Sequence, residues 1–418
     1  MQIDMLIFIY YEKAFISFFI TLLKETDMEQ RCIIKIIKAS LWNDSIEGIT
    51  ISEDVFQEMK KHTIVSLPGS ILSKMDMPEE LRRRWKKELL QQIAYSVNYR
   101  YIQEHLPIKV PYVIIKGTTA AQYYPYPEYR TMGDIDILTK REDFDTAYKQ
   151  FTENGYQVIN RLNREIALRK NGVTIELHKY FASIPDTEKA KKLDDLIIHN
   201  INSTHVLPDL INGIVLLEHI SQHMEHGLGL RQIIDWMMFV DKYLSDENWQ
   251  EFASYAQENN LERLAIVTTR MCEIYLGLPL RKWSSNADEK KCDELLEYVL
   301  SCGNFGIKRN NDSSKSESTF IALRKPQNIF RLLHDRGLSN WSLAKEYKVF
   351  RPVAWLYQLF RYISRGLKRE NATYKIKEEY NHAKQRYDLF NYLGVCQSSQ
   401  GRIVYKDNKY QIEDVSFR

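Results

Sequence analysis

Residues 112–138 read YVIIKGTTAAQYYPYPEYRTMGDIDIL. The short run of apolar and β-branched residues at 110–115 predicts a strand, and residues 135–138 predict a second one. Gly117 follows the first strand directly, so the chain can turn tightly there before a helix begins. The segment therefore predicts a strand, a glycine corner and a second strand that carries acidic residues.

The second strand presents two carboxylates on one side. Side chains alternate between the two faces of a strand, so Asp134 and Asp136 are expected to point the same way, about 7 Å apart. Two such carboxylates repel each other unless a cation lies between them, and Mg²⁺ suits oxygen ligands. Glu176 has the same alternation, between Ile175 and Leu177, and is the candidate for a third carboxylate on a neighbouring strand.

The residues that follow extend this sheet. A helical pattern at 144–154 closes at Gly155, a residue type typical of helix C-terminal caps. Asn171 and Gly172 predict a tight hairpin turn, so the two strands that they join pair antiparallel and the sheet is mixed. The further strands are expected at 156–159, 166–169 and 173–178.

The chain of 418 residues is long enough for two or three domains. Its few glycines (16) and prolines (11) favour helix, so we expect an α+β core flanked by helical N- and C-terminal regions. The predicted units are an N-terminal helical region (1–106), the core (107–188), a helical domain (189–305), a flexible loop (306–320), and C-terminal helices with a small hairpin (321–418).

Within the last unit, residues 330–366 are expected to be helical. Residues 402–415 predict the hairpin, turning at Asp407-Asn408. The core candidates of the helical part are Trp341, Trp355 and Phe360.

Composition excludes several classes of protein. The 58 basic and 55 acidic residues leave a net charge of +3, too even for a dedicated nucleic-acid coat. Five widely spaced cysteines without a CxxC pair argue against a zinc knuckle, a redox motif and a disulfide framework, and favour a reducing cytoplasm. No GxSxG, GxGxxG or GxxxxGK[ST] pattern occurs.

The first 27 residues are apolar and aromatic, but Glu12 and Lys13 interrupt them. The uninterrupted run at 14–23 is too short to span a bilayer, so no stable membrane insertion is expected. We interpret the segment as a buried or partner-facing helix, with a membrane-associated segment and an upstream extension before Met28 as alternatives.

A site for a nucleoside triphosphate needs groups that hold its phosphates. The amides beside Gly117 and the hydroxyls of Thr118 or Thr119 are candidates for this contact. Lys116 and Arg130 are candidates for the positive charges.

The order of these elements resembles the nucleotidyltransferase fold of the DNA polymerase β superfamily, and most closely its branch of uncharacterised bacterial nucleotidyltransferases. A threonine stands where the superfamily usually has serine after the glycine, and the connection to Asp134 is longer, with Pro125 and Pro127. The matching parts are Lys116-Gly117, the Tyr- and Pro-rich residues 123–130, the Gly-Asp-Ile-Asp core 133–136, the strand 175–178 and a helix pair with His219, His223 and residues 231–235.

The resemblance implies a polymerase β-like domain that transfers a nucleoside monophosphate from an NTP such as ATP to a hydroxyl acceptor and releases pyrophosphate. It implies two Mg²⁺ ions held by Asp134, Asp136 and Glu176. The residues that it assigns to the nucleotide are Lys116, Gly117, Thr118, Thr119, Arg130, Gly133 and His178. The acceptor remains open among a small molecule, a protein and an RNA.

Histidines near these segments have competing interpretations. His178 shares a strand face with Glu176, so it either orients the metal ligands and touches nucleotide or is an ordinary half-buried histidine. His219, His223 and His226 share one helix face, which lines a cleft, binds a metal or consists of ordinary core or surface histidines. Arg231 and Asp235, four residues apart, are most simply an ion pair within one helix.

Two rival functions remain. A degenerate fold would bind a nucleotide or a partner without catalysis. The basic cluster at 82–87 is either an exposed charged face or a contact for RNA, which would indicate an RNA-modifying enzyme.

Overall fold

The computed structural model describes residues 28–184, 186–308, 333–334, 337–338, 340–367, 372–395, 402–406 and 409–413. The interpretation of residues 1–27 and residues 309–320 of the loop predicted at 306–320 therefore lie outside the described residues. Among the described residues, no helix combines the length and the apolar character needed to cross a membrane.

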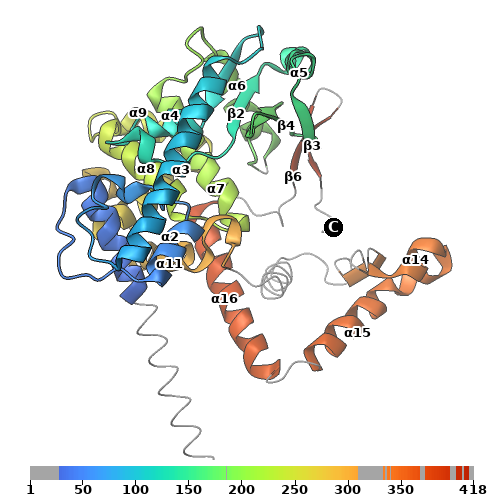
Figure 1. Ribbon diagram of the computed structural model, residues 1–418. Coiled ribbons are helices and arrows are strands. Elements are labelled where there is room, and N and C mark those ends of the chain that lie inside the picture. The colour runs from blue at the N-terminus through green and yellow to red at the C-terminus, as the bar shows by residue number, and fades with distance from the viewer. Residues whose placement is uncertain are drawn as a thin grey trace, which may run out of the picture.

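The N-terminal region is helical, as predicted (Figure 1). Ser52 caps α2 (Glu53–Lys61) by accepting a hydrogen bond from the Val55 amide. Helix α3 (Glu79–Glu104) begins after Pro78, and two glutamates in its first turn favour that helix end. The remaining helical pieces are residues 28–42 and η1 (Leu67–Ser70).

A mixed sheet of five strands has the order β1-β2-β5-β4-β3. Strand β2 pairs antiparallel with β1 and parallel with β5, and the β5–β4 and β4–β3 pairs are antiparallel. The predicted α+β class and mixed sheet are confirmed. The strands are β1 (Tyr112–Ile115), β2 (Ile135–Thr139), β3 (Gln157–Arg161), β4 (Glu165–Lys170) and β5 (Val173–His178).

Local signals placed the turns correctly. Asn171 and Gly172 both have positive φ (49° and 78°), as a two-residue hairpin turn requires. Helix α5 (Phe144–Glu153) is followed by Gly155 at φ 80°, a backbone conformation that glycine adopts without strain.

The two faces of the sheet have different neighbours. One face packs Ile135, Ile137, Ile175 and Leu177 with residues from α3 and α5 into a small apolar core. Apolar residues of the opposite face, such as Leu138, join the large core made with the helices. Asp136, Glu176 and His178 alternate with these four residues along the strands. They therefore lie on the opposite face, the one that Leu138 shares and that meets the large core.

The helices after the sheet supply most of the large core. Helix α8 (Leu230–Lys242) is buried along most of its length, which explains its near-continuous apolar sequence. The others are α6 (Thr187–His199), α7 (Asp209–His226), α9 (Trp249–Glu258), α10 (Glu262–Met271), η4 (Cys272–Leu276) and α11 (Glu289–Cys302). Four cysteines (Cys32, Cys272, Cys292 and Cys302) are buried and free, as their spacing predicted.

The C-terminal elements are α14 (Ser342–Glu346), η7 (Lys348–Val353), α15 (Ala354–Leu367), α16 (Ala372–Leu393), β6 (Arg402–Lys406) and β7 (Lys409–Glu413). The predicted hairpin is confirmed by the antiparallel pairing of β6 with β7. The prediction of Phe360 as a core residue is wrong, because its side chain is 66% exposed. Trp341 and Trp355 are only partly buried. A helical apolar pattern shows that a helix has an apolar face, but it does not show what covers that face.

Candidate active site

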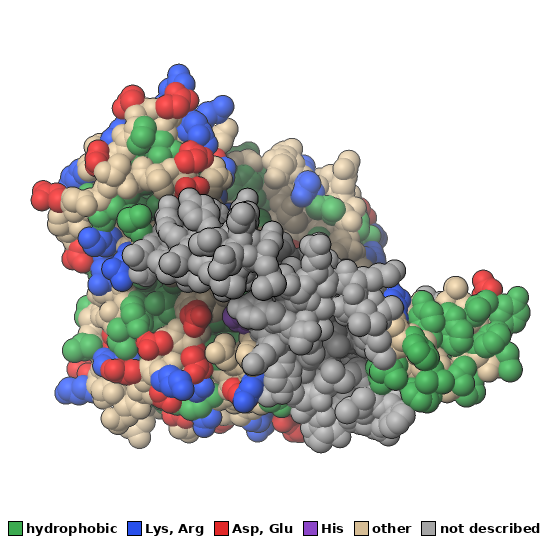
Figure 2. All heavy atoms as spheres, turned by 90° about the horizontal axis from the view of Figure 1, so that it is seen from below, with side chains coloured by type: hydrophobic (Ala, Val, Ile, Leu, Met, Phe, Trp, Pro, Cys, Tyr) green, Lys and Arg blue, Asp and Glu red, His purple; other side chains and the backbone are tan. Residues whose placement is uncertain are grey.

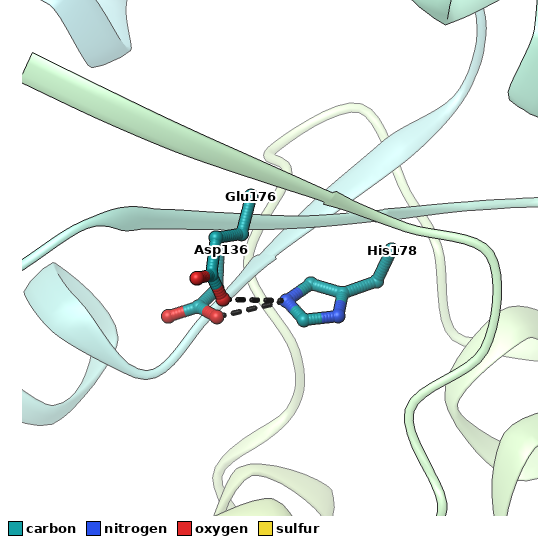
Figure 3. Close-up of side chains that lie close together, drawn as sticks. All are labelled: Asp136, Glu176 and His178. Atoms are coloured by element: carbon teal, nitrogen blue, oxygen red, sulfur yellow. Dashed lines mark hydrogen bonds and ion pairs between the residues drawn. The ribbon is translucent and has the colours of Figure 1, made fainter. Parts of the chain in front are cut away.

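Asp136 and Glu176 are direct neighbours on the parallel strands β2 and β5. Figure 3 shows the two carboxylates side by side, with the imidazole of His178 directed at both. The pairing brings together acids that are 40 positions apart in the chain, in the arrangement that the alternation of the two strands predicted.

His178 connects three carboxylates. Its Nε2 lies 2.9 Å from Asp136 Oδ1 and 3.6 Å from Glu176 Oε2, and its Nδ1 lies 3.2 Å from Glu165 Oε2. The ring is fully buried rather than half-buried, and both of its nitrogens face carboxylates.

Glu165 was missed by the sequence interpretation, although a signal for it was present. A two-residue turn at Asn171-Gly172 fixes the register of β4 against β5. The first pair after the turn is Lys170 with Val173, and five residues further along each strand Glu165 lies opposite His178. The hairpin register, applied to the strand before the turn, would have identified it.

The acids differ in electrostatic character. Burial and repulsion by Asp134 and then Asp136 raise the pKa of Glu176 to about 8. Burial also opposes the charge of Asp136, but Lys116 and His178 outweigh it and hold the pKa of Asp136 below its usual value. Glu176 is therefore the carboxylate whose negative charge is least compensated, and an added cation would stabilise it.

His178 carries a positive charge more readily than a free histidine. Burial lowers its pKa, but hydrogen bonds to Asp136 and Glu165 outweigh burial and raise it. Glu165 is partly buried, which raises its pKa, yet His178 outweighs this and holds the pKa of Glu165 at about 2. A positive charge on the His178 ring would thus lie between the carboxylates of Asp136 and Glu165.

Asp134 lies just before β2, which begins at Ile135. Two tyrosines of α3 hold the backbone here: Tyr95 donates to the Gly133 carbonyl at 2.6 Å and Tyr99 donates to the Asp134 carbonyl at 3.0 Å. The charge of Asp134 acts on Glu176, which places the third predicted acid within electrostatic reach of the pair.

The corner at Lys116 and Gly117 is strained and tightly packed. Lys116 has φ 59° and ψ −143°, a conformation that costs energy for a residue with a side chain. Gly117 has φ 41°, and a Cβ at this position would lie 2.2 Å from the Tyr99 hydroxyl. The corner thus requires glycine, as the sequence indicated.

The side chains around this corner have partners within the protein. Lys116 Nζ lies 2.7 Å from Asp136 Oδ1, so it neutralises a site carboxylate. The Thr118 hydroxyl donates to Gln103 at 2.7 Å, and the buried Thr119 hydroxyl donates to the Lys116 carbonyl at 2.6 Å. In this structure, these three side chains shape the corner.

Arg130 forms a buried, two-point ion pair with Asp235. Its Nε and Nη2 each lie 2.7 Å from an Asp235 oxygen, and Tyr124 donates to the same carboxylate at 2.7 Å. The expected pair of Arg231 with Asp235 within α8 is therefore wrong. The carboxylate turns toward the segment that precedes β2, because Arg130 offers a planar fork that fits both oxygens.

Arg231 contacts the same segment. Its Nη1 is 3.6 Å from the position that a Cβ on Gly133 would occupy, and 3.4 Å from the Thr131 carbonyl. Within the described part of the chain its Nε has no hydrogen-bond partner. This guanidinium next to Gly133 and Asp134 is the second residue whose position the sequence did not reveal.

The three histidines of α7 do not assemble a metal site. The rings of His219 and His223 contact each other at 4.4 Å between centroids, and His223 also contacts Phe305, whereas His226 is exposed. Burial and Lys116 lower the pKa of His223 to about 3, so its ring is neutral near pH 7.

The arginines of the basic cluster on α3 contact groups within the protein. Arg82 donates to the carbonyls of Leu72 and Met75, and Arg84 forms a two-point pair with Glu53. These contacts favour the interpretation of an exposed charged face.

A divalent cation fits the acidic group. One potential ligand atom from each of Asp136, Glu176 and His178 lies within 4.8 Å of the others, and this is the one such group among the described residues. The carboxylates of Asp136 and Glu176 repel each other, and a cation between them would relieve this repulsion. Carboxylate oxygens are also the donors that Mg²⁺ prefers. Asp134 is outside this close group, because it precedes the strand.

Comparison with known proteins gave one match. A family model described as an uncharacterised nucleotidyltransferase matches residues 52–277, more than half of the chain, including the sheet, α7 and α8. No curated protein and no solved structure matches the chain.

Proposed function

We propose that this chain, which belongs to the uncharacterised nucleotidyltransferase family, moves a nucleoside monophosphate from an NTP to a hydroxyl acceptor. The acceptor oxygen would attack the α-phosphorus, the bond from that phosphorus to the β-phosphate would break, and pyrophosphate would leave. In this proposal residues 107–188 are the catalytic core of a polymerase β-like domain. The neighbouring carboxylates Asp136 and Glu176 on the parallel strands are the observation that carries it.

The acids would have distinct roles. Asp136 and Glu176, with Asp134 from the preceding loop, would hold two Mg²⁺ ions, which supply positive charge to the phosphates and the attacking oxygen. His178 would keep the Asp136 carboxylate ionised and fixed in direction. Once a cation has offset the repulsion that raises its pKa, Glu176 would be ionised and would also take the proton of the acceptor hydroxyl.

The triphosphate would lie between the corner and α8. Backbone amides at Gly117 and Thr118 are the proposed contacts on one side, as the sequence suggested. Because Arg130 is paired with Asp235 and Lys116 with Asp136, we assign the opposite contact to Arg231, next to Gly133. An Arg231→Gln variant should bind NTP about tenfold or more weakly, because a hydrogen bond to a charged group is lost.

One observation favours the alternative of nucleotide binding without catalysis. Lys116 already neutralises Asp136, which reduces the demand for a cation there. The alternative predicts NTP binding without pyrophosphate release, and little sensitivity to Glu176→Gln.

One experiment distinguishes nucleotidyl transfer from nucleotide binding without catalysis. Purified protein is incubated with each α-labelled NTP, Mg²⁺ and a cell extract, and transfer of label is followed together with pyrophosphate release. Glu176→Gln should abolish transfer with little change in the thermal melt, because the change removes repulsion and loses only the 3.6 Å ion pair with His178. The exposed Asp145→Asn on α5 is the control and should transfer normally. A Glu176→Gln protein with most of its turnover would contradict the proposal.

A further inference from the structure

Residues 341–361, called the arm here, form a small helical unit outside the residues matched by the family. In Figure 1 its helices α14 and α15 project from the rest of the protein. Figure 2 shows hydrophobic side chains gathered over this projecting lobe.

The arm is held together by one set of residues. Trp341 stacks on Tyr357 with ring centroids 5.1 Å apart, and Ala344, Ala354 and Gln358 are buried. Asn340 also donates to Gln358 at 3.1 Å. These contacts join α15 to α14 and the residues just before it.

A different set of apolar residues faces outward. Val349 is 75% exposed and Phe360 is 66% exposed, although neither contributes to the buried contacts of the arm. Val353, at the end of η7, and Phe360, in α15, are both exposed. The exposed apolar set is Leu343, Tyr347, Val349, Phe350, Val353, Leu359 and Phe360, of which Phe350 also contacts Trp341. Such a contiguous patch on a soluble surface marks an interaction site.

The positive charge of the arm indicates which kind of partner it binds. It has four basic residues (Lys345, Lys348, Arg351 and Arg361) and one acidic residue, Glu346. Lys348 and Arg351 are exposed within the apolar patch. A second copy would bring like charges together, whereas an anionic bilayer offers both opposite charge and an apolar interior.

We propose that the arm docks on the surface of an anionic phospholipid bilayer, with Val349 and Phe360 entering the headgroup region. The helix lies on the membrane and does not span it. This proposal concerns where the protein works and is independent of the chemistry at Asp136 and Glu176.

The test uses the full chain and vesicles of phosphatidylcholine, alone or mixed with phosphatidylserine. Full-length protein should sediment with the mixed vesicles and not with the neutral ones, and added salt should release it. The double variant Val349→Glu/Phe360→Glu should partition about tenfold or more weakly, since two apolar side chains no longer enter the bilayer. Leu90→Glu on α3 is the matched control, because Leu90 is also 66% exposed, and it should bind as the parent does.

Three results would overturn the proposal. The first is equal sedimentation with neutral and mixed vesicles. The second is unchanged binding by the double variant, with circular dichroism showing that it is folded. The third is a parent protein that forms a dimer in sedimentation equilibrium and loses it in the double variant, which would identify a second copy as the partner.

Discussion

Replacing Asp235 tests whether Arg130 serves the fold through its buried ion pair. Arg130 and Asp235 are 5% and 2% exposed, and two hydrogen bonds of 2.7 Å join them. Asp235→Ala leaves a buried guanidinium without a counter-charge, and it also removes the acceptor of Tyr124. Breaking a buried pair in this way costs about 3–5 kcal/mol, a large fraction of the stability of a typical protein.

The control has the same geometry at the surface. Arg84 and Glu53 form a two-point pair at 2.9 Å, but water surrounds both side chains. Glu53→Ala should therefore leave the midpoint of urea unfolding nearly unchanged, since solvent already screens this pair. Circular dichroism in urea, with the parent and both variants side by side, measures the difference.

A double variant sharpens the test. Arg130→Met with Asp235→Leu removes both charges and should recover most of the stability lost in Asp235→Ala, because no buried charge is left unpaired. If Asp235→Ala is no less stable than Glu53→Ala, or if the double variant is as unstable as the single one, the structural role given to Arg130 is refuted.

Three further predictions follow from single contacts. Gly117→Ala should destabilise the protein by about 1–2 kcal/mol, because alanine is strained in the left-handed backbone conformation of Gly117. The added Cβ also clashes with the Tyr99 hydroxyl, which Tyr99→Phe removes. Urea unfolding of the double variant should therefore show partial rescue. His223 has a folded pKa of about 3 against an ordinary 6.5, so the unfolded chain binds the extra proton and stability should fall as pH drops from 6.5 toward 3. His223→Gln should flatten that part of the stability profile, and an equally steep profile would contradict it. Tyr410→Phe removes the hydroxyl that donates to Asp194, so amide exchange in β6 and β7 should accelerate; unchanged exchange would show that this contact does not hold the hairpin.

Local sequence patterns determined the elements of the core. The turn at Asn171-Gly172 and the strands on either side follow from residues that are neighbours in the chain. The alternation around Asp136 and Glu176 fixed which face each acid takes, because side chains on a strand have a period of two. The composition and charge of the whole chain were consistent with this core but carried no information about its site.

Partners across the chain were decided only by the tertiary structure. Asp235 pairs with Arg130, 105 residues away, although Arg231 is one helical turn from it. The periodicity around Phe360 is as regular as that of a core helix, yet no described element covers this residue. The physical reason is that spacing fixes the direction of a side chain relative to its own backbone, whereas its neighbour in space depends on how distant elements pack.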